Sequence, residues 1–264
     1  MKEVNMKKHL VDREVSIRKD PCDGYVECAS DDSIKACAND KMSELSHAVV
    51  WSGGLDSTLI LIDLIKRGIQ PTVLTFTCDT FGGLHQQEFE KSARTEILKY
   101  IAKEYSYEIR MADNISMKYS NIGIGHNVFG KDGGIVQQPY MLSMLSIFSP
   151  NNTCYHMGYH KGDDFWTYSY DIISAHKHLL AVTGNKNVEL SFPLQHMTKA
   201  DIIRKLQGYK FPIELCSYCY SPEYSGPCGS CAACETYRKA MQEIAISKSL
   251  ESDIVYKHGL LPKE

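Results

Sequence analysis

One heptapeptide decides the fold expected for this chain: Ser52-Gly53-Gly54-Leu55-Asp56-Ser57-Thr58. A short apolar run at residues 48–51 precedes it and predicts a buried strand, while residues 59–68 follow with the apolar face of a helix. A glycine-rich loop in that setting directs several backbone N–H groups at one point, where the helix dipole favours an anion. The stretch therefore predicts a phosphate-binding loop whose glycines let the backbone approach the ligand closely.

The side chains of this loop add to the predicted site. Ser52, Ser57 and Thr58 offer hydroxyl donors, and Asp56 can order the loop or hold a cation. A pair of glycines alone is common in turns, whereas S-G-G-x-D-S between a strand and a helix is a far more specific signal.

The composition is that of a globular protein of 264 residues with a formal net charge of −3. The length allows one large domain, or one domain with appendages. The charge gives no overall basic field, so we do not expect nucleic acid as a partner. There is no apolar run long enough to span a membrane and no signal core, and we expect a cytoplasmic protein. Ten cysteines in such a chain favour metal binding or free thiols over disulfides.

Strands and helices alternate along the first half of the predicted fold. Strands are expected at residues 48–51, 70–77 and 107–111, with helices at 59–68 and 86–105 between them. This alternation predicts an α/β fold with a doubly wound parallel sheet, whose ligands bind beyond the carboxyl ends of the strands.

The remaining segments continue the pattern. Residues 113–137 are rich in glycine and predict a loop that covers the site. The further expected elements are a helix at 139–148, a strand at 154–158, a helix at 171–182, a strand at 188–192, a helix at 199–206 with Thr198 as its N-cap, and a terminal helix at 235–246. Residues 1–46 form an extension with a predicted short hairpin, whose Cys22, Cys28 and Cys37 read as free or packed thiols.

A cysteine cluster near the end of the chain indicates a metal site. Cys228, Cys231 and Cys234 form two overlapping C-x-x-C units, and a fourth thiolate could come from Cys219 or Cys216. Thiolates at this spacing bind zinc tetrahedrally, while C-x-x-C-x-x-C also occurs around iron–sulfur clusters. Both metals remain open from the spacing alone.

The heptapeptide resembles the loop of the PP-loop ATP pyrophosphatases, and it lacks the terminal Gly-Lys-Ser/Thr of a Walker loop. Three further motifs are similar to the QueC family: residues 81–88 resemble Y-G-Q-x-H-x-x-E, residues 193–199 match P-L-x-x-x-x-K, and Cys219 precedes C-G-x-C-x-x-C by eight intervening residues. The resemblance covers about residues 47–240. It selects Cys219 over Cys216 as the fourth ligand, and zinc over iron–sulfur.

The resemblance implies domains at 47–210 (an adenine nucleotide alpha hydrolase-like ATP-binding domain) and 211–264 (a helical zinc-binding segment). It also implies ATP and Mg²⁺ as cofactors beside Zn²⁺. It assigns residues 52–58 to ATP, and Asp56, Ser57 and Lys199 to catalysis. We expect His85, Asp164 and Asp171 as candidate substrate contacts. An aromatic loop at 165–170 is expected to stack on the substrate base.

The implied reaction is adenylation of 7-carboxy-7-deazaguanine, amidation by ammonia, and dehydration to 7-cyano-7-deazaguanine. Two family stretches, V-P-x-R-N and Y-P-D-C-R, lack clear matches, so the acceptor pocket is altered. An enzyme that stops at the amide, or that transfers the activated acid to an amine of a protein or other large molecule, is therefore an alternative. A PP-loop tRNA-modifying enzyme and a non-enzymatic nucleotide sensor are further alternatives. We expect a homodimer.

Overall fold

A computed structural model describes residues 45–78, 83–111, 115–117, 137–184, 187–220 and 226–257. The chain divides into two compact units, Met1–Cys37 and Ala38–Glu264, and all described residues lie in the second. The hairpin and three cysteines predicted within residues 1–46, and most of the loop predicted at 113–137, lie outside the described residues.

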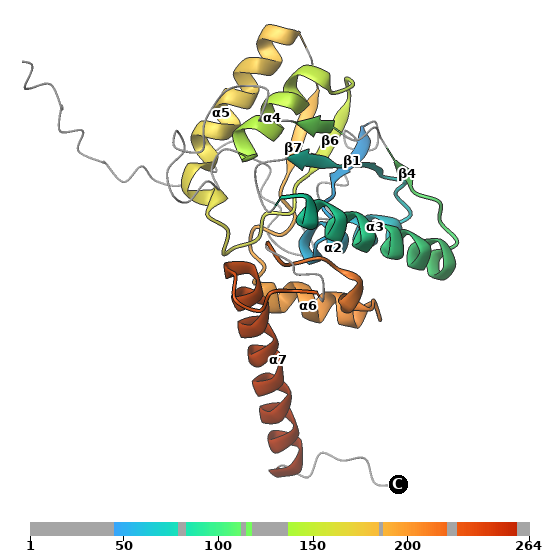
Figure 1. The fold of residues 1–264 in the computed structure, drawn as a ribbon, viewed down its shortest axis with the longest axis vertical. Helices are drawn as coiled ribbons and strands as arrows, with labels where there is room; N and C mark the ends of the chain where they lie inside the picture. Colours follow the sequence, from blue (N-terminus) through green and yellow to red (C-terminus); the bar gives the residue numbers. More distant parts are fainter. Residues whose placement is uncertain are drawn as a thin grey trace, which may run out of the picture. The chain divides into compact units, whose positions relative to one another are not determined.

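A parallel sheet forms the centre of the fold (Figure 1). Across the sheet its five described strands are β4 (Arg110–Met111), β2 (Thr72–Leu74), β1 (Ser46–Val50), β6 (Thr153–His156) and β7 (Val188–Ser191). Every neighbouring pair is parallel, which requires crossover connections through helices. The predicted parallel α/β fold is confirmed.

The described helices are α2 (Leu55–Lys66), α3 (Gly83–Tyr105), α4 (Gln137–Phe148), α5 (Phe165–Thr183), α6 (Lys199–Gly208) and α7 (Ala232–Lys257), with a 3₁₀ turn, η4, at Ile213–Leu215. In Figure 1, α4 and α5 lie side by side, away from α2, α3 and α6. The predicted N-cap of α6 is confirmed: the Thr198 hydroxyl accepts from the Asp201 N–H at 3.2 Å, and the Asp201 carboxylate accepts from the Thr198 N–H at 2.9 Å.

Several predicted boundaries are wrong, and three of them bear on the site. Helix α2 begins at Leu55, because Gly54 is its extended N-cap and the Thr58 N–H already bonds to the Gly54 carbonyl at 3.0 Å. The strand predicted at 70–77 is divided, since β3 (Phe76–Cys78) leaves the main sheet and pairs with β5 (Ile115–Met117). The aromatic loop predicted at 165–170 is instead the beginning of α5.

One apolar core joins the helices on one side of the sheet to the C-terminal segment. Its members include wholly buried side chains of α2, α3 and α6, namely Leu61, Ile62, Ile97, Ile101, Ile202 and Ile203. Phe211, Ala240 and Ile244 belong to the same core, so residues on both sides of the boundary predicted at 210/211 pack together. The hydrophobic effect therefore holds the cysteine-bearing segment against the sheet domain.

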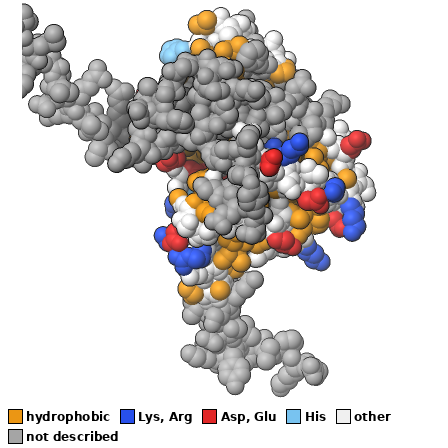
Figure 2. All heavy atoms as spheres, in the orientation of Figure 1, with side chains coloured by type: hydrophobic (Ala, Val, Ile, Leu, Met, Phe, Trp, Pro, Cys, Tyr) orange, Lys and Arg blue, Asp and Glu red, His pale blue; other side chains and the backbone are white. Residues whose placement is uncertain are grey.

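Charges of both signs are mixed on the described part of one face. On the described part of the face in Figure 2, Lys and Arg side chains lie beside Asp and Glu rather than in a field of one sign. None of the described helices is both long enough and apolar enough to cross a membrane.

We predict that Leu61→Ala lowers the free energy of unfolding by about 2–5 kcal/mol, because it leaves a cavity in the core where Leu61 is 0% exposed. Urea titration followed by circular dichroism measures the change. Val182→Ala is the control, since Val182 is 83% exposed and should shift stability by no more than about 0.5 kcal/mol. Equal midpoints for Leu61→Ala and the wild type would remove Leu61 from the core.

Candidate active site and metal centre

The phosphate loop leaves the carboxyl end of β1 in a conformation that the glycines permit. Gly53 has φ +87°, a left-handed value that other residues rarely adopt. The Ser52 hydroxyl accepts from the Gly54 N–H at 3.2 Å and remains exposed at the surface of the loop. The N–H groups of residues 55–57 begin α2 and have no acceptor within the helix, so they offer donors to an anion.

The hydroxyls of Ser57 and Thr58 lie beneath the loop. Thr58 is wholly buried and accepts from the Trp51 indole N–H at 3.0 Å, which ties the first turn of α2 to the end of β1. The Ser57 hydroxyl accepts from the Ser52 N–H at 3.3 Å. These two side chains shape the loop, whereas Ser52 is the exposed hydroxyl.

A buried arginine that the sequence analysis did not identify supports the loop from α3. Arg94 is 8% exposed and donates from Nη1 to the Ser52 carbonyl at 3.0 Å. A Cβ at Gly53 would lie 2.8 Å from the Arg94 Cγ, so glycine is required at 53 for space as well as for φ. Burial lowers the pKa of Arg94, opposed by Glu90, whose carboxylate lies 3.5 Å from Nη1. The sequence offers one local signal for this role, since Arg94 stands between the apolar residues Ala93 and Ile97 in the helix predicted at 86–105.

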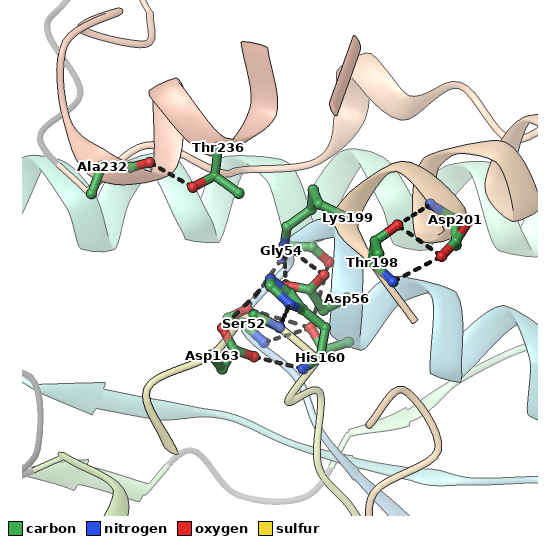
Figure 3. A network of polar contacts seen from close by, with 12 residues as sticks. Ser52, Gly54, Asp56, His160, Asp163, Thr198, Lys199, Asp201, Ala232 and Thr236 are labelled. Carbon is green, nitrogen blue, oxygen red and sulfur yellow. Dashed lines mark hydrogen bonds and ion pairs between the residues drawn. The ribbon is translucent and has the colours of Figure 1, made fainter. Parts of the chain in front are cut away.

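The structure brings Asp56 and Lys199 into direct contact. The Lys199 amine lies 2.6 Å from both carboxylate oxygens of Asp56, and both side chains are mostly buried (Figure 3). Asp56 is in the first turn of α2 and Lys199 is the first residue of α6. The two motifs that the sequence analysis quoted separately therefore form one site at the carboxyl edge of the sheet.

The turn after β6 lies at the same carboxyl edge of the sheet, beside the start of α2. A Cβ at Gly158 would lie 3.1 Å from the Ser57 nitrogen, so the turn passes directly against the start of α2. The His160 N–H donates to the Asp163 carboxylate at 2.6 Å, and Figure 3 shows the pair beside the loop. Burial raises the pKa of Asp163 while His160 lowers it, and the charges of Asp56 and Lys199 also act on this carboxyl. Asp163 and His160 are residues that the sequence analysis missed in favour of their neighbour Asp164.

The three predicted substrate residues have different positions. Asp164 is exposed at the N-cap of α5, and the charge of this carboxylate helps to raise the pKa of Tyr159 after the larger effect of burial. Asp171 is exposed farther along α5. His85 lies in the first turn of α3, and its side chain is outside the described part of the structure. Of the three, Asp164 is the one placed next to the turn after β6.

The predicted aromatic stacking surface is mostly used for packing. Phe165 is 1% exposed and stacks on Tyr159, with ring centroids 3.9 Å apart and planes 4° apart. Trp166 and Phe192 complete this cluster through edge and tilted contacts. Tyr168 and Tyr170 are the exposed aromatics of the segment. The interpretation of 165–170 as an exposed stacking loop is therefore wrong, because Phe165 and Trp166 form a small core with Tyr159 after β6 and Phe192 after β7.

Four cysteine sulfurs converge as a zinc site requires. The Sγ atoms of Cys219, Cys228, Cys231 and Cys234 all lie within 4.8 Å of one another. The Cys219 sulfur is 3.5 Å from that of Cys228 and 3.9 Å from that of Cys231, close to the roughly 3.8 Å expected between thiolates around tetrahedral zinc. Backbone N–H groups of Ser230 and Cys231 donate to Cys228 and lower the pKa of its thiol to about 6, which favours the thiolate that a metal binds.

Cys216 is excluded from this cluster. It is 3% exposed, belongs to the apolar core, and burial raises the pKa of its thiol to about 12. The choice of Cys219 over Cys216, which the sequence analysis drew from the resemblance, agrees with the geometry.

The cysteine segment is attached to the phosphate loop through the backbone. The Ser217 N–H donates to the Gly53 carbonyl at 3.0 Å, and Ser217 forms a parallel bridge with Gly54. Cys219, two residues farther on, is a member of the cluster. A metal held by the four cysteines would therefore stabilise the segment that supports the loop.

A family model and individual relatives of this chain point to the same family of proteins. A family model described as "Queuosine biosynthesis protein QueC" matches residues 140–245. The resemblance to the QueC family is confirmed. A "7-cyano-7-deazaguanine synthase" of Geobacter metallireducens is 24% identical over 218 residues, covering 75% of this chain and 90% of the relative. A protein of the same name from Syntrophus aciditrophicus is 41% identical over 64 residues, covering 24% of this chain and 28% of that relative.

Two solved structures match this chain with low structural similarity. A "predicted subunit of tRNA methyltransferase" from Methanocaldococcus jannaschii has 16% identity, a TM-score of 0.41, and covers 76% of this chain and 88% of the other. An NMN synthetase from Francisella tularensis has 16% identity, a TM-score of 0.42, and coverages of 69% and 67%. These scores are too low to identify a shared fold, and the fold assignment depends on the sheet itself.

We predict that Cys231→Ser removes the zinc bound by the four cysteines and lowers the melting temperature by about 5 °C or more, because structural zinc contributes directly to folding. Elemental analysis and thermal unfolding measure the two effects. Cys216→Ala is the control and should retain this zinc, since Cys216 lies outside the cluster. Iron together with a visible chromophore in the wild-type protein would contradict the assignment to zinc.

Proposed function

We propose that this chain is an ATP-using ligase of the QueC type that acts on 7-carboxy-7-deazaguanine. The observation that carries the proposal is the contact between Asp56 and Lys199 at the phosphate loop, which unites two motifs 143 residues apart in one site. The four-cysteine cluster and the names of the relatives support the same assignment.

The proposed chemistry begins with a carboxylate, which is a poor electrophile because its leaving group would be oxide. In the first step a carboxylate oxygen attacks the α-phosphorus of ATP, and pyrophosphate leaves. Ammonia then attacks the acyl carbon, AMP leaves, and a proton is lost to give the amide. A second adenylation activates the amide oxygen, and loss of AMP with two protons gives the nitrile.

The residues of the site have distinct roles in this proposal. The N–H groups of the first turn of α2, with the exposed Ser52 hydroxyl, receive the phosphates that leave as pyrophosphate. The Lys199 amine forms an ion pair with Asp56 in the structure. When ATP binds, this amine would leave the Asp56 carboxylate and contact a phosphate oxygen instead. Asp56 supplies the hard oxygen ligands that suit Mg²⁺, which when bound would neutralise charge on the leaving pyrophosphate.

A second candidate keeps the adenylation and changes the acceptor. The stretches of the family that match least well are those expected at the acceptor, while the loop and Lys199 are intact. The aromatic segment after β6 is a packed helix start rather than an open stacking loop. Both observations favour an acceptor pocket of different shape, in which the reaction stops at the amide or the acid is transferred to an amine on a protein or another large molecule.

We predict that Asp56→Asn and Lys199→Met each lower the rate of AMP formation by about 100-fold or more, because each removes one charge that acts on the phosphates. A coupled assay for AMP with 7-carboxy-7-deazaguanine present measures the rate. Glu189→Gln, an exposed carboxylate on β7, is the matched control and should keep the wild-type rate. Near-normal rates for both site variants would exclude the ion pair from the reaction.

Product analysis distinguishes the two candidates. With 7-carboxy-7-deazaguanine, ATP and ammonium, mass spectrometry should detect the nitrile with two AMP formed per product. The amide with one AMP per product would establish the shorter reaction. Release of AMP together with an amine conjugate of the acid, detected only when a protein acceptor is added, would establish the transfer. If the deazaguanine acid stimulates no ATP cleavage, the substrate assignment is wrong and only the adenylating fold remains.

A further inference from the structure

We propose a second metal site, formed by His47, Cys154 and His156 on the central strands β1 and β6, that binds a borderline divalent cation such as zinc. None of these residues belongs to the four-cysteine cluster. The proposal is independent of the function proposed above.

The sheet register brings the three side chains together. In the parallel pairing of β1 with β6, His47 is opposite Cys154 and Val49 is opposite His156. Side chains alternate between the two faces of a strand, so residues 47, 49, 154 and 156 all project from the same face. In this register the ligand atoms of His47, Cys154 and His156 lie within 4.8 Å of one another.

The contact between the two histidines shows that at least one of the two facing ring nitrogens is unprotonated. His47 Nδ1 and His156 Nε2 are 2.9 Å apart, and the rings are nearly parallel, with planes 15° apart and centroids 5.2 Å apart. Two ring nitrogens can approach this closely only if at least one of them carries no proton and offers its lone pair. A bare imidazole nitrogen is the form that binds a metal.

The donor set selects the kind of metal. Two imidazoles and a thiolate suit zinc and copper, whereas magnesium and calcium require oxygen ligands that this cluster does not contain. Donors at about 2.0–2.3 Å from a common zinc lie roughly 3.3–3.8 Å apart, so side-chain movements of about an ångström would bring the observed donors to these separations. Three protein ligands leave one coordination position for water or a further donor.

The position of the site predicts a structural role. His156 is 5% exposed and Cys154 is 1% exposed, so an ion bound there would be largely removed from water. His47 is the second residue of β1, and five residues of extended chain, about 16 Å, separate it from Ser52 of the phosphate loop. The ion would therefore join β1 to β6, the strands that lead to the loop and to Gly158, without reaching the phosphates.

The test is the zinc content of the full chain after loading with zinc and dialysis. We expect two zinc ions per wild-type chain. His156→Asn and Cys154→Ala should each bind one, held by the four cysteines, and should melt at a lower temperature than the wild type only when zinc is present. His178→Asn is the matched control, because His178 is exposed on α5 and should leave two zinc ions bound.

A spectroscopic measurement on the wild type keeps the proposal testable even if the variants do not fold. X-ray absorption at the zinc edge should show imidazole nitrogen at about 2.0 Å together with sulfur at about 2.3 Å. A shell of sulfur alone, or one zinc per wild-type chain that both triad variants retain, would overturn the proposal and leave the histidines as a hydrogen-bonded pair in the sheet.

Discussion

The contact between the Asp56 carboxylate and the Lys199 amine is the interaction on which the candidate site depends. It joins the first turn of α2 to the first turn of α6, and both helix starts lie at the carboxyl edge of the sheet. Opposite charges in a partly buried position interact more strongly than they would in water, because the surrounding protein screens them less. The same position keeps a cation next to the anion-binding helix start, which suits a ligand that carries several negative charges.

The loop between these charges is held from two further directions. Arg94 of α3 donates to the Ser52 carbonyl on one side, and the Ser217 N–H donates to the Gly53 carbonyl on the other. Both bonds use carbonyl groups, so the backbone N–H groups of the helix start remain available for a ligand. The segment around Ser217 leads directly into the four-cysteine cluster, and a metal there would stabilise the loop as well as the C-terminal helix.

The central strands carry polar groups at the carboxyl edge of the sheet and along one face. At the carboxyl end, β1 leads into the phosphate loop and β6 leads into Gly158 and the pair His160–Asp163. Along one face of the same two strands, His47 lies beside Cys154 and His156, and His156 is the last residue of β6. The parallel register permits this arrangement because residues paired across β1 and β6 project from the same face of the sheet.

The sequence by itself determined the elements that local patterns encode. The phosphate loop and the Thr198 cap depend on residues within a few positions of one another, and the alternation of strands and helices and the cysteine spacing are patterns read along continuous stretches of the chain. The tertiary structure alone decided which distant residues meet: Lys199 with Asp56, Arg94 with Ser52, and His47 with His156. It also decided that residues 165–170 begin a helix, because Phe165 gains a buried stack on Tyr159 that no local pattern reveals. Contacts of this kind depend on strand order and register, and those are set by the packing of the whole core rather than by any single segment.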